Sequence, residues 1–262
     1  MISEHLPNIK GLIIDMDGVL WHDTQPIGDL PAIFAQIQSS GLKTILATNN
    51  TTKTIDEFHQ KLRDFGVVLE EWQVINSSQA LGALLQEKYP HGADIYVIGQ
   101  PSLKNTLSEF GFRIVTEQED AHLVVSGLDY TLTFDKLKHA YLLIRNGCEY
   151  FATNGDATYP TLEGLIPGSG SIVAALETAS GRKAKIVGKP SPDLYEIALK
   201  RLQLPPEETL AIGDRLETDI VGAQVAGIHT ALVLTGASTL DQLKNFQPKP
   251  DIVAEDLTDL IF

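Results

Sequence analysis

The stretch GLIIDMDG, residues 11–18, joins a short apolar run to two acidic residues and a glycine. A short apolar run of this kind is typical of a parallel strand that is buried on both faces. Asp15 and Asp17 come where this strand would end, and Gly18 allows the chain to turn sharply there. In an open parallel α/β sheet, ligands bind at the carboxyl ends of the strands. The stretch therefore predicts a buried strand with a polar site at its end.

Apolar runs and amphipathic stretches alternate along almost the whole chain, which favours a parallel, doubly wound sheet. Strands are predicted at residues 11–15, 43–47, 74–75, 94–98, 122–126, 150–152, 185–187, 209–212, 230–234 and 251–253, and helices at 30–39, 54–65, 80–88, 102–110, 134–146, 171–180, 193–202 and 220–226. A second alternating series begins with the helix at 80–88, and the first kind of pattern returns with the strand at 185–187. Each series could form its own sheet.

The two carboxylates of the first segment can have separate tasks. One can attack phosphorus, because an aspartate can form an aspartyl-phosphate. The other can protonate the leaving oxygen and then activate a water molecule. Taken alone, however, the pattern of Asp15, Asp17 and Gly18 is equally compatible with a solvated turn after a strand.

Polar residues also follow two further predicted strands. Thr48 and Asn49 offer a hydroxyl and amides that can bind phosphate oxygens without adding negative charge, although the threonines after them could simply cap the next helix. Lys189 is followed by two prolines that stiffen its segment, and a lysine among carboxylates can bind a transferring phosphoryl group. An exposed loop lysine is the alternative.

The fourth polar segment, residues 212–219, brings two more carboxylates to a strand end. Asp214 and Asp219 suit Mg²⁺, a hard cation that prefers oxygen ligands, and Gly213 leaves room beside them. Thr218 or Asp219 could instead cap the following helix. Turns and caps do not require an acidic pair, a hydroxyl, a lysine and a second acidic pair in this order. Together the four segments therefore favour a magnesium-dependent site for phosphate chemistry.

Acidic residues outnumber basic ones, with 34 Asp and Glu against 20 Lys and Arg in 262 residues, and the formal net charge is −14. Such a chain repels nucleic acid and anionic membranes, so neither is expected as a partner. A phosphate site here needs local positive charge, which a bound cation and a lysine would supply. No apolar run approaches the ~20 residues of a membrane span. With no signal-peptide pattern and Cys148 as the only cysteine, we expect a cytoplasmic protein.

The four segments resemble the four motifs of the haloacid dehalogenase (HAD) superfamily phosphatases. The matching stretches are DMDGV at 15–19, the threonine of ATNNT at 48, GKPSPD at 188–193 and GDRLETD at 213–219. The chain is more specifically similar to the NagD-like, p-nitrophenyl phosphatase-like branch, through GKPSPDLYEIAL, IGDRLETDI, YFATNGDATYP and GLIPGSGSIVAALETASGRKA. The resemblance extends over nearly the whole chain.

This resemblance implies an α/β protein with a Rossmann-like parallel-sheet core at residues 1–77 and 184–262, interrupted by an α/β cap domain at 78–183. It also implies a phosphatase that hydrolyses small phosphate monoesters, such as nucleotide, sugar or glycerol phosphates, through an aspartyl-phosphate, with Mg²⁺ as cofactor. p-Nitrophenyl phosphate would serve as a model substrate. The expected partner is a small phosphorylated metabolite, and the same resemblance favours a homodimer through the cap.

The family's metal and proton-transfer roles fall on the acidic residues. By the resemblance, Asp15 is the nucleophile and a metal ligand, and Asp17 is the general acid and base. Asp17 also binds the metal through its backbone carbonyl, and Asp214 is the third ligand. Asp219 orients either the water shell of the metal or the lysine.

The phosphate-binding roles fall on the polar and basic residues. Thr48 and the Asn49 amide hold the transferring phosphoryl group, and Lys189 neutralises both that group and Asp15. In the cap, Asn154, Asp156 and Tyr159 are candidates for substrate contacts, although each could instead shape a structural turn.

Two other functions fit the same residues. A phosphotransferase or phosphomutase would pass the aspartyl-phosphate to an acceptor other than water. A non-catalytic module would bind phosphate only as a ligand, but such a module need not keep Asp15, Asp17, Lys189 and Asp214 together. A dinucleotide-binding fold is set aside, because no G-x-G-x-x-G follows the first strand.

Overall fold

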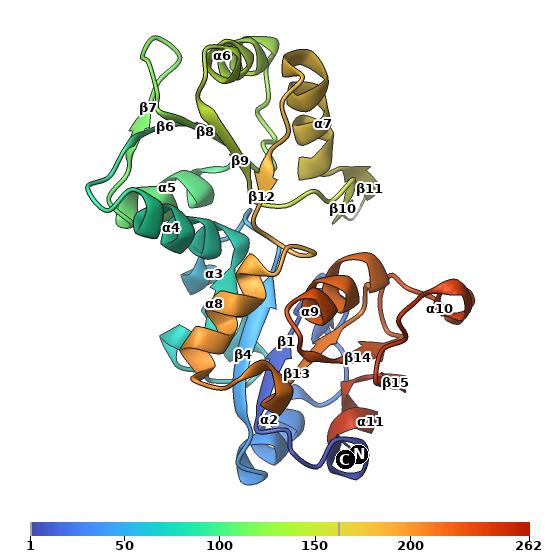
Figure 1. Cartoon of the computed structure of the whole chain (residues 1–262). Helices are drawn as coiled ribbons and strands as arrows, with labels where there is room; N and C mark the ends of the chain where they lie inside the picture. Colours follow the sequence, from blue (N-terminus) through green and yellow to red (C-terminus); the bar gives the residue numbers. More distant parts are fainter. Residues whose placement is uncertain (1, 162) are drawn as a thin grey trace. The chain divides into compact units, whose positions relative to one another are not determined.

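The computed structural model describes residues 2–161 and 163–262, and it divides into two compact units. The first unit consists of Met1–Thr48, Ile55–Ile75 and Lys189–Phe262, and the second consists of Asn49–Thr54 and Asn76–Gly188. Each unit is a sheet with helices packed on it (Figure 1). Within the described residues, no helix has the length and apolar character that a membrane crossing requires.

A six-stranded sheet in the order β15-β14-β13-β1-β4-β5 forms the centre of the first unit. Its strands are β1 (Gly11–Ile14), β4 (Lys43–Thr48), β5 (Val74–Asn76), β13 (Thr209–Gly213), β14 (His229–Val233) and β15 (Ile252–Ala254). β1 runs parallel to both of its neighbours, and β14 runs parallel to β13 and β15. The predicted Rossmann-like parallel sheet is confirmed.

The helices of the first unit follow the strands in alternation. They are α1 (Ile2–His5), α2 (Leu30–Ser39), α3 (Ile55–Asp64), α8 (Asp193–Leu202), α9 (Val221–Val225), α10 (Leu240–Asn245) and α11 (Leu257–Ile261), with short turns η1 (Glu71–Gln73), η2 (Pro206–Glu208) and the π-turn η3 (Leu216–Ile220). A two-stranded ribbon, β2 (Trp21–His22) and β3 (Gln25–Pro26), follows β1. The sequence did not predict this ribbon, α1, α10 or α11, which are all short.

Burial on both faces explains why β1 is apolar throughout. Leu12 and Ile14 are fully buried in the main core cluster, together with residues of α2 and α3, and Ile13 between them is 1% exposed. Because every side chain of the strand is buried, hydrophobic burial holds it in the interior of the sheet. The first polar side chain after this strand, Asp15, therefore lies at the sheet's edge.

The second unit has a five-stranded sheet in the order β12-β9-β8-β6-β7, with parallel pairing throughout. Its strands are β6 (Asp94–Ile98), β7 (Arg113–Val115), β8 (Leu123–Ser126), β9 (Glu149–Ala152) and β12 (Lys185–Ile186), and an antiparallel hairpin joins β10 (Thr158–Thr161) to β11 (Gly164–Pro167). The sequence did not predict β7 or the hairpin.

Two helix pairs cover this second sheet. They are α4 (Ser77–Lys88) with α5 (Pro101–Glu109), and α6 (Phe134–Arg145) with α7 (Ser169–Ser180), and Figure 1 shows the two pairs on opposite faces. Capping fixes where these helices begin and end. The Thr133 side chain accepts from Lys136 N–H at the start of α6, and Gly181 ends α7 with a φ of 68°.

Candidate active site

The register of the central strands brings two of the predicted segments to one edge of the first sheet. Ile14 pairs with both Leu46 and Ile212, so Asp15 lies level with the carboxyl ends of β4 and β13. The Asp15 N–H donates a hydrogen bond of 2.9 Å to the carbonyl of Ile212. Parallel pairing thus places residues from distant parts of the sequence beside the Asp15 carboxylate.

Lys189 connects three parts of this edge. Its ammonium donates to Asp15 Oδ1 and, over 3.0 Å, to the carbonyl of Ala47, and it lies 2.7 Å from Asp219 Oδ1. The Lys189 side chain is only 3% exposed. The alternative of an exposed loop lysine is therefore wrong, and the ammonium lies between two carboxylates.

The charges of this cluster do not balance. Burial acts to lower the pKa of Lys189, but Asp15 and Asp219 outweigh it and hold this pKa well above its usual range. Burial raises the pKa of Asp15; Lys189 opposes this rise, and Asp219 and Asp214 add to it. Burial, followed by repulsion from Asp219, raises the pKa of Asp214 to about 6. One ammonium thus faces three buried carboxylates, an arrangement that favours an additional cation.

The carboxylates also have the geometry of a site for a hard cation. Oxygens of Asp15, Asp214 and Asp219 lie within 4.8 Å of one another. Asp214 Oδ2 accepts from Ala237 N–H at 2.6 Å, whereas Oδ1 is buried and has no hydrogen-bond partner among the described residues. A buried carboxylate oxygen without a donor is poorly stabilised unless a cation binds it. The residues therefore fit Mg²⁺, which prefers oxygen ligands.

Asp219 differs from the other two carboxylates because both of its oxygens have protein donors. Oδ1 faces Lys189, and Oδ2 accepts from Arg215 N–H at 3.0 Å. A Cβ at Gly213 would lie 2.2 Å from the Asp219 Cβ, so this glycine allows the close approach. Neither η3 nor α9 begins with a side-chain cap, which excludes the capping alternative for Thr218 and Asp219. The arrangement suits a residue that positions Lys189.

Two glycines allow the backbone to approach Asp214 closely. A Cβ at Gly236 would lie 1.9 Å from Asp214 Oδ2, and a Cβ at Gly18 would lie 2.7 Å from the same oxygen. Gly18 also has a φ of 88°, which side chains rarely adopt. Gly18 was predicted from the sequence, but Gly236 and Ala237 were not, because no strand or motif pattern connects them to residue 214.

Asp17 is held by an indole. Trp21 Nε1 donates to Asp17 Oδ1 over 2.7 Å, and the Trp21 side chain is fully buried. Lys61 Nζ lies 4.0 Å from the centre of the indole ring and covers it. Asp17 thus has one oxygen fixed by a neutral donor. No pattern in the sequence indicates this contact.

Thr48 is the last residue of β4 and is 3% exposed, whereas the next residue, Asn49, packs with the second unit. Asn49 Nδ2 donates to Asp156 Oδ2 over 3.2 Å, and Asn154 Nδ2 donates to the Asn49 carbonyl over 3.0 Å. Two of the three predicted cap residues therefore bind directly to the segment that follows Thr48.

The third predicted cap residue, Tyr159, binds the same segment. Asn50 Nδ2 donates to its hydroxyl over 3.3 Å, and Thr52 Oγ1 lies 3.4 Å from that hydroxyl. The ring of Tyr130, which is 55% exposed, meets the Tyr159 ring edge to face at 6.5 Å. Asn50, Thr52 and Tyr130 were not predicted, because only the fold brings them beside residue 159.

Fold and site together define an α/β protein with an acidic cluster at the carboxyl ends of a parallel sheet. Two family models match the chain: haloacid dehalogenase-like hydrolase at residues 12–113, and HAD-hydrolase-like at 186–260. The acid sugar phosphatase of Staphylococcus aureus is 32% identical over 252 residues, which are 96% of each chain.

The solved structures that are similar to this chain include phosphatases as well. The 4-nitrophenylphosphatase of Thermotoga maritima superposes with a TM-score of 0.92 at 33% identity, covering 98% of each chain. A glycerol phosphate phosphatase of Mycobacterium tuberculosis, solved in complex with magnesium, gives 0.90 at 34% identity over 98% of this chain and 77% of its own. The chain belongs to the haloacid dehalogenase superfamily, in its NagD-like, p-nitrophenyl phosphatase-like branch. As such it is an enzyme of the phosphoric monoester hydrolase class.

Proposed function

We propose that the chain is a Mg²⁺-dependent phosphatase that hydrolyses small phosphate monoesters through an aspartyl-phosphate on Asp15. The observation that carries the proposal is the position of Lys189, whose buried ammonium lies between Asp15 and Asp219. A charge held there can neutralise both the attacking carboxylate and the oxygens of a phosphoryl group. A purely structural role would not require a nucleophile, a lysine and acidic residues together at one edge of the sheet.

Asp15 and Asp17 divide the chemistry between them. The Asp15 carboxylate attacks phosphorus, and the bond to the alcohol oxygen breaks as the bond to Asp15 forms. Asp17 gives its proton to the departing alcohol, and then takes a proton from the water that hydrolyses the aspartyl-phosphate. Trp21 donates to Asp17 Oδ1 and so holds this carboxyl in one orientation.

Thr48 and Lys189 position the phosphoryl group. The hydroxyl of Thr48, at the carboxyl end of β4, and the backbone amide of the next residue, Asn49, donate to its oxygens. Asp219 keeps Lys189 in place and charged. Positioning and charge stabilisation are the main needs of phosphoryl transfer, so these residues are expected to matter for kcat.

The metal ligands would be the carboxylates of Asp15 and Asp214 with the backbone carbonyl of Asp17. Bound Mg²⁺ would supply positive charge for the phosphoryl oxygens and would partner the Asp214 oxygen, for which the described residues offer no donor. The −14 net charge of the chain makes this local positive charge a requirement for binding a phosphate.

Residues 78–183 act as a cap that selects the alcohol part of the substrate, in this proposal. Asn154, Asp156 and Tyr159 are its contact residues, since all three are hydrogen-bonded to the segment that directly follows Thr48. We propose a small phosphorylated metabolite as substrate, a homodimer through the cap and a cytoplasmic location, with neither nucleic acid nor membrane as partner.

The test is phosphate release from p-nitrophenyl phosphate, followed by a panel of nucleotide, sugar and glycerol phosphates. Activity should need Mg²⁺, and Asp15→Asn should lower kcat by at least about 10³-fold. Asp64→Asn, at an exposed position of α3, is the matched control and should keep full activity. Unchanged activity in Asp15→Asn would exclude the proposed nucleophile, and transfer to an added sugar in place of water would make the enzyme a phosphotransferase.

A further inference from the structure

One short segment of the first unit contacts both of the loops that carry proposed metal ligands. Residues 235–238 follow β14 and precede α10. The chain is held on either side of them: Leu234 N–H donates to the Ala254 carbonyl at the end of β15 over 3.1 Å, and Thr239 begins α10 with a capping box. These four residues, hereafter the 235–238 segment, are therefore fixed at both ends.

Three hydrogen bonds join this segment to the loop of Asp214. Ala237 N–H donates to Asp214 Oδ2 over 2.6 Å, and Ser238 N–H donates to the Asp214 carbonyl over 3.0 Å. The Ser238 hydroxyl, which is buried, accepts from Leu216 N–H over 2.9 Å. The same segment thus holds the carboxylate of Asp214, its backbone and the start of η3.

The segment also contacts the loop that follows β1. Thr235 Oγ1 donates to the carbonyl of Gly18 over 2.6 Å. Gly18 directly follows Asp17, whose own carbonyl is a proposed ligand, and a Cβ at Gly18 would lie 2.7 Å from Asp214 Oδ2. The 235–238 segment thus connects the two loops whose spacing determines whether Asp17 and Asp214 can bind one cation.

Gly236 gives the segment room to approach Asp214. A Cβ at this glycine would lie 1.9 Å from Asp214 Oδ2 and 2.4 Å from Asp214 Cβ, so any side chain there would displace the whole aspartate side chain. Gly236 does not have the left-handed φ of Gly18. Close approach, and not backbone conformation, is therefore what requires a glycine at position 236.

These contacts make the two oxygens of Asp214 unequal. Oδ2 accepts from Ala237 N–H and is packed against the backbone of Gly236 and Gly18. Oδ1 is buried, and none of the described residues donates to it. Hydrogen bonds to a ligating carboxylate set its orientation, so a donor that binds one oxygen favours the other as the metal ligand.

We propose that the 235–238 segment is a positioning element of the metal site, which orients Asp214 so that Oδ1 ligates Mg²⁺. The inference rests on the proposed function, because it takes Asp214 as a ligand of the metal. Partners of this kind typically change metal affinity by about 10–100-fold when they are removed. The segment is therefore expected to act on the affinity for Mg²⁺ and, through it, on the rate.

The test is the affinity of the full-length protein for Mg²⁺, measured by isothermal titration calorimetry without substrate. Gly236→Ala should weaken Mg²⁺ binding at least about tenfold, because the new Cβ displaces the Asp214 side chain. Ser238→Ala removes only a hydroxyl, so it keeps the test valid if Gly236→Ala does not fold. It should weaken binding about tenfold, and kcat should return to within about twofold of the unaltered enzyme at saturating Mg²⁺.

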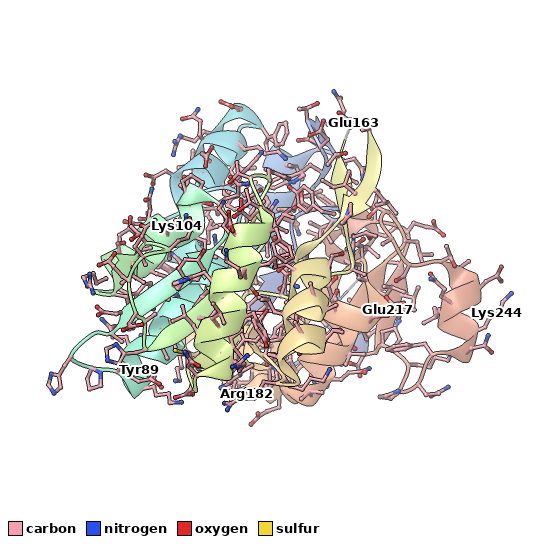
Figure 2. The ribbon with its side chains drawn as sticks, turned by 90° about the horizontal axis from the view of Figure 1, so that it is seen from above. Tyr89, Lys104, Glu163, Arg182, Glu217 and Lys244 are labelled. Atoms are coloured by element: carbon pink, nitrogen blue, oxygen red, sulfur yellow. The ribbon has the colours of Figure 1, made fainter. Side chains whose placement is uncertain are left out.

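Thr239→Ala is the matched control for stability. The Thr239 hydroxyl accepts from Gln242 N–H at the start of α10, so its loss should lower the melting temperature. The affinity for Mg²⁺ should stay within about twofold. Figure 2 shows Lys244 of α10 well apart from Glu217 of η3, so α10 extends away from the metal loop. The control thus separates a loss of stability from a loss of metal affinity.

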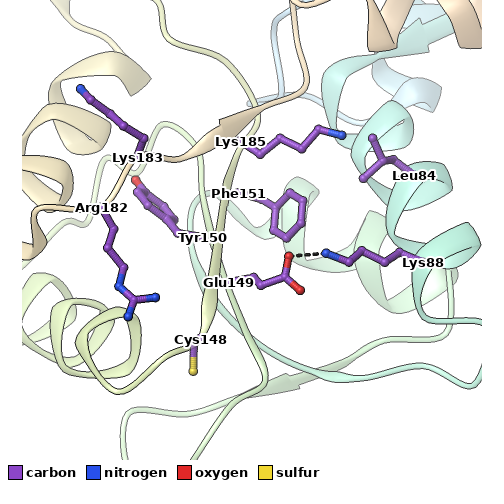
Figure 3. A pocket seen from close by; sticks show the side chains of 9 residues that line it. All are labelled: Leu84, Lys88, Cys148, Glu149, Tyr150, Phe151, Arg182, Lys183 and Lys185. Carbon is purple, nitrogen blue, oxygen red and sulfur yellow. Dashed lines mark hydrogen bonds and ion pairs between the residues drawn. The ribbon is translucent and has the colours of Figure 1, made fainter.

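Glu149→Gln is the control for Mg²⁺ bound by acidic side chains elsewhere. In Figure 3, Glu149 faces Lys88 at a pocket of the second unit, and the two form an ion pair. None of the nine residues that line this pocket is a proposed metal ligand. The affinity for Mg²⁺ should therefore stay within about twofold in this variant.

The outcomes separate this inference from the proposed function. Absence of Mg²⁺ binding by the unaltered protein would overturn the proposed metal site, and the inference with it. Binding by the unaltered protein with the same affinity in Gly236→Ala and Ser238→Ala would overturn the inference alone, as would an equal loss of affinity in Thr239→Ala. A crystal structure with Mg²⁺ should show coordination by the Asp214 oxygen that does not accept from Ala237 N–H. Coordination by the other oxygen alone would also overturn the inference.

Discussion

Lys189 and Asp219 form a buried ion pair, with 2.7 Å between Nζ and Oδ1 and side chains that are 3% and 4% exposed. Asp219 is therefore in a position to hold the ammonium in place as charge moves between Asp15 and a phosphoryl group. A surface ion pair would contribute little, but a buried partner whose loss leaves an unbalanced charge is costly to remove.

Replacing Asp219 tests this positioning role. Asp219→Asn keeps the size of the side chain but removes its charge, and we expect kcat to fall about 10–100-fold with a smaller change in KM. Steady-state rates with p-nitrophenyl phosphate at saturating Mg²⁺ measure the effect, and Asp64→Asn is the control. A kcat within about twofold of the unaltered enzyme would show that Lys189 does not need this partner.

Replacing Asp214 should lower the activity of the enzyme but raise the stability of the metal-free protein. In Asp214→Asn, activation by Mg²⁺ is expected to disappear, because a ligand is lost. Without metal, the same change relieves repulsion among three buried carboxylates, so the melting temperature in EDTA should rise by about 2–4 °C, the shift that 1 kcal/mol gives in a chain of this size. Thermal melts with EDTA and with Mg²⁺ separate the two effects. A lower melting temperature of the variant in EDTA would contradict the claim that the three carboxylates repel one another without metal.

Asp129 gives a prediction about pH in the second unit. Its side chain is 1% exposed and lies 2.8 Å from Lys136 Nζ. Burial acts to raise the pKa of Asp129, but hydrogen bonds from Lys136 and Thr131 outweigh it and lower this pKa. A carboxyl whose pKa is lowered by folding stabilises the folded state above its unfolded pKa of about 3.9, and this contribution is lost as the pH falls through the folded pKa.

Asp129→Asn should therefore lower the free energy of unfolding by about 1–3 kcal/mol at neutral pH, where a buried charge-assisted hydrogen bond is lost. The difference in free energy between variant and unaltered protein should shrink below about pH 4, where Asp129 begins to protonate in the unfolded chain. Urea unfolding across this range provides the measurement. Asp135→Asn, which breaks an exposed pair with Lys138, is the matched control and should cost less than about 1 kcal/mol. Equal costs for the two variants would contradict the role of burial.

The central strands were predictable because burial leaves a direct record in the sequence. β1 is apolar at every position since both of its faces are covered, and the polar residue after it marks its end. Parallel pairing then determines which strand ends meet, so Asp15 and Asp214 could be expected together from strand order. Lys189 could not, because the strand before it, β12, belongs to the other sheet. The predicted fold class and family are both confirmed.

The remaining parts of the site depend on contacts that leave no periodic pattern in the sequence. Gly236 lies against Asp214 only because a loop after β14 returns to it, and Trp21 reaches Asp17 through a two-stranded ribbon that is too short to predict. The bond between Asn50 and Tyr159 joins residues more than a hundred positions apart. Single polar contacts of this kind leave no pattern that propensity or periodicity could detect.

The most direct test of the proposed mechanism is to trap the phosphorylated enzyme in Asp17→Asn. Without the general base, attack of water on the aspartyl-phosphate should be slow, while attack by Asp15 on phosphorus still occurs. After mixing with substrate and Mg²⁺ and quenching in acid, peptide mass spectrometry should find one phosphoryl group on Asp15. Phosphate release at the normal rate with no phosphoryl group on that residue, or a phosphoryl group on another residue, would contradict the account.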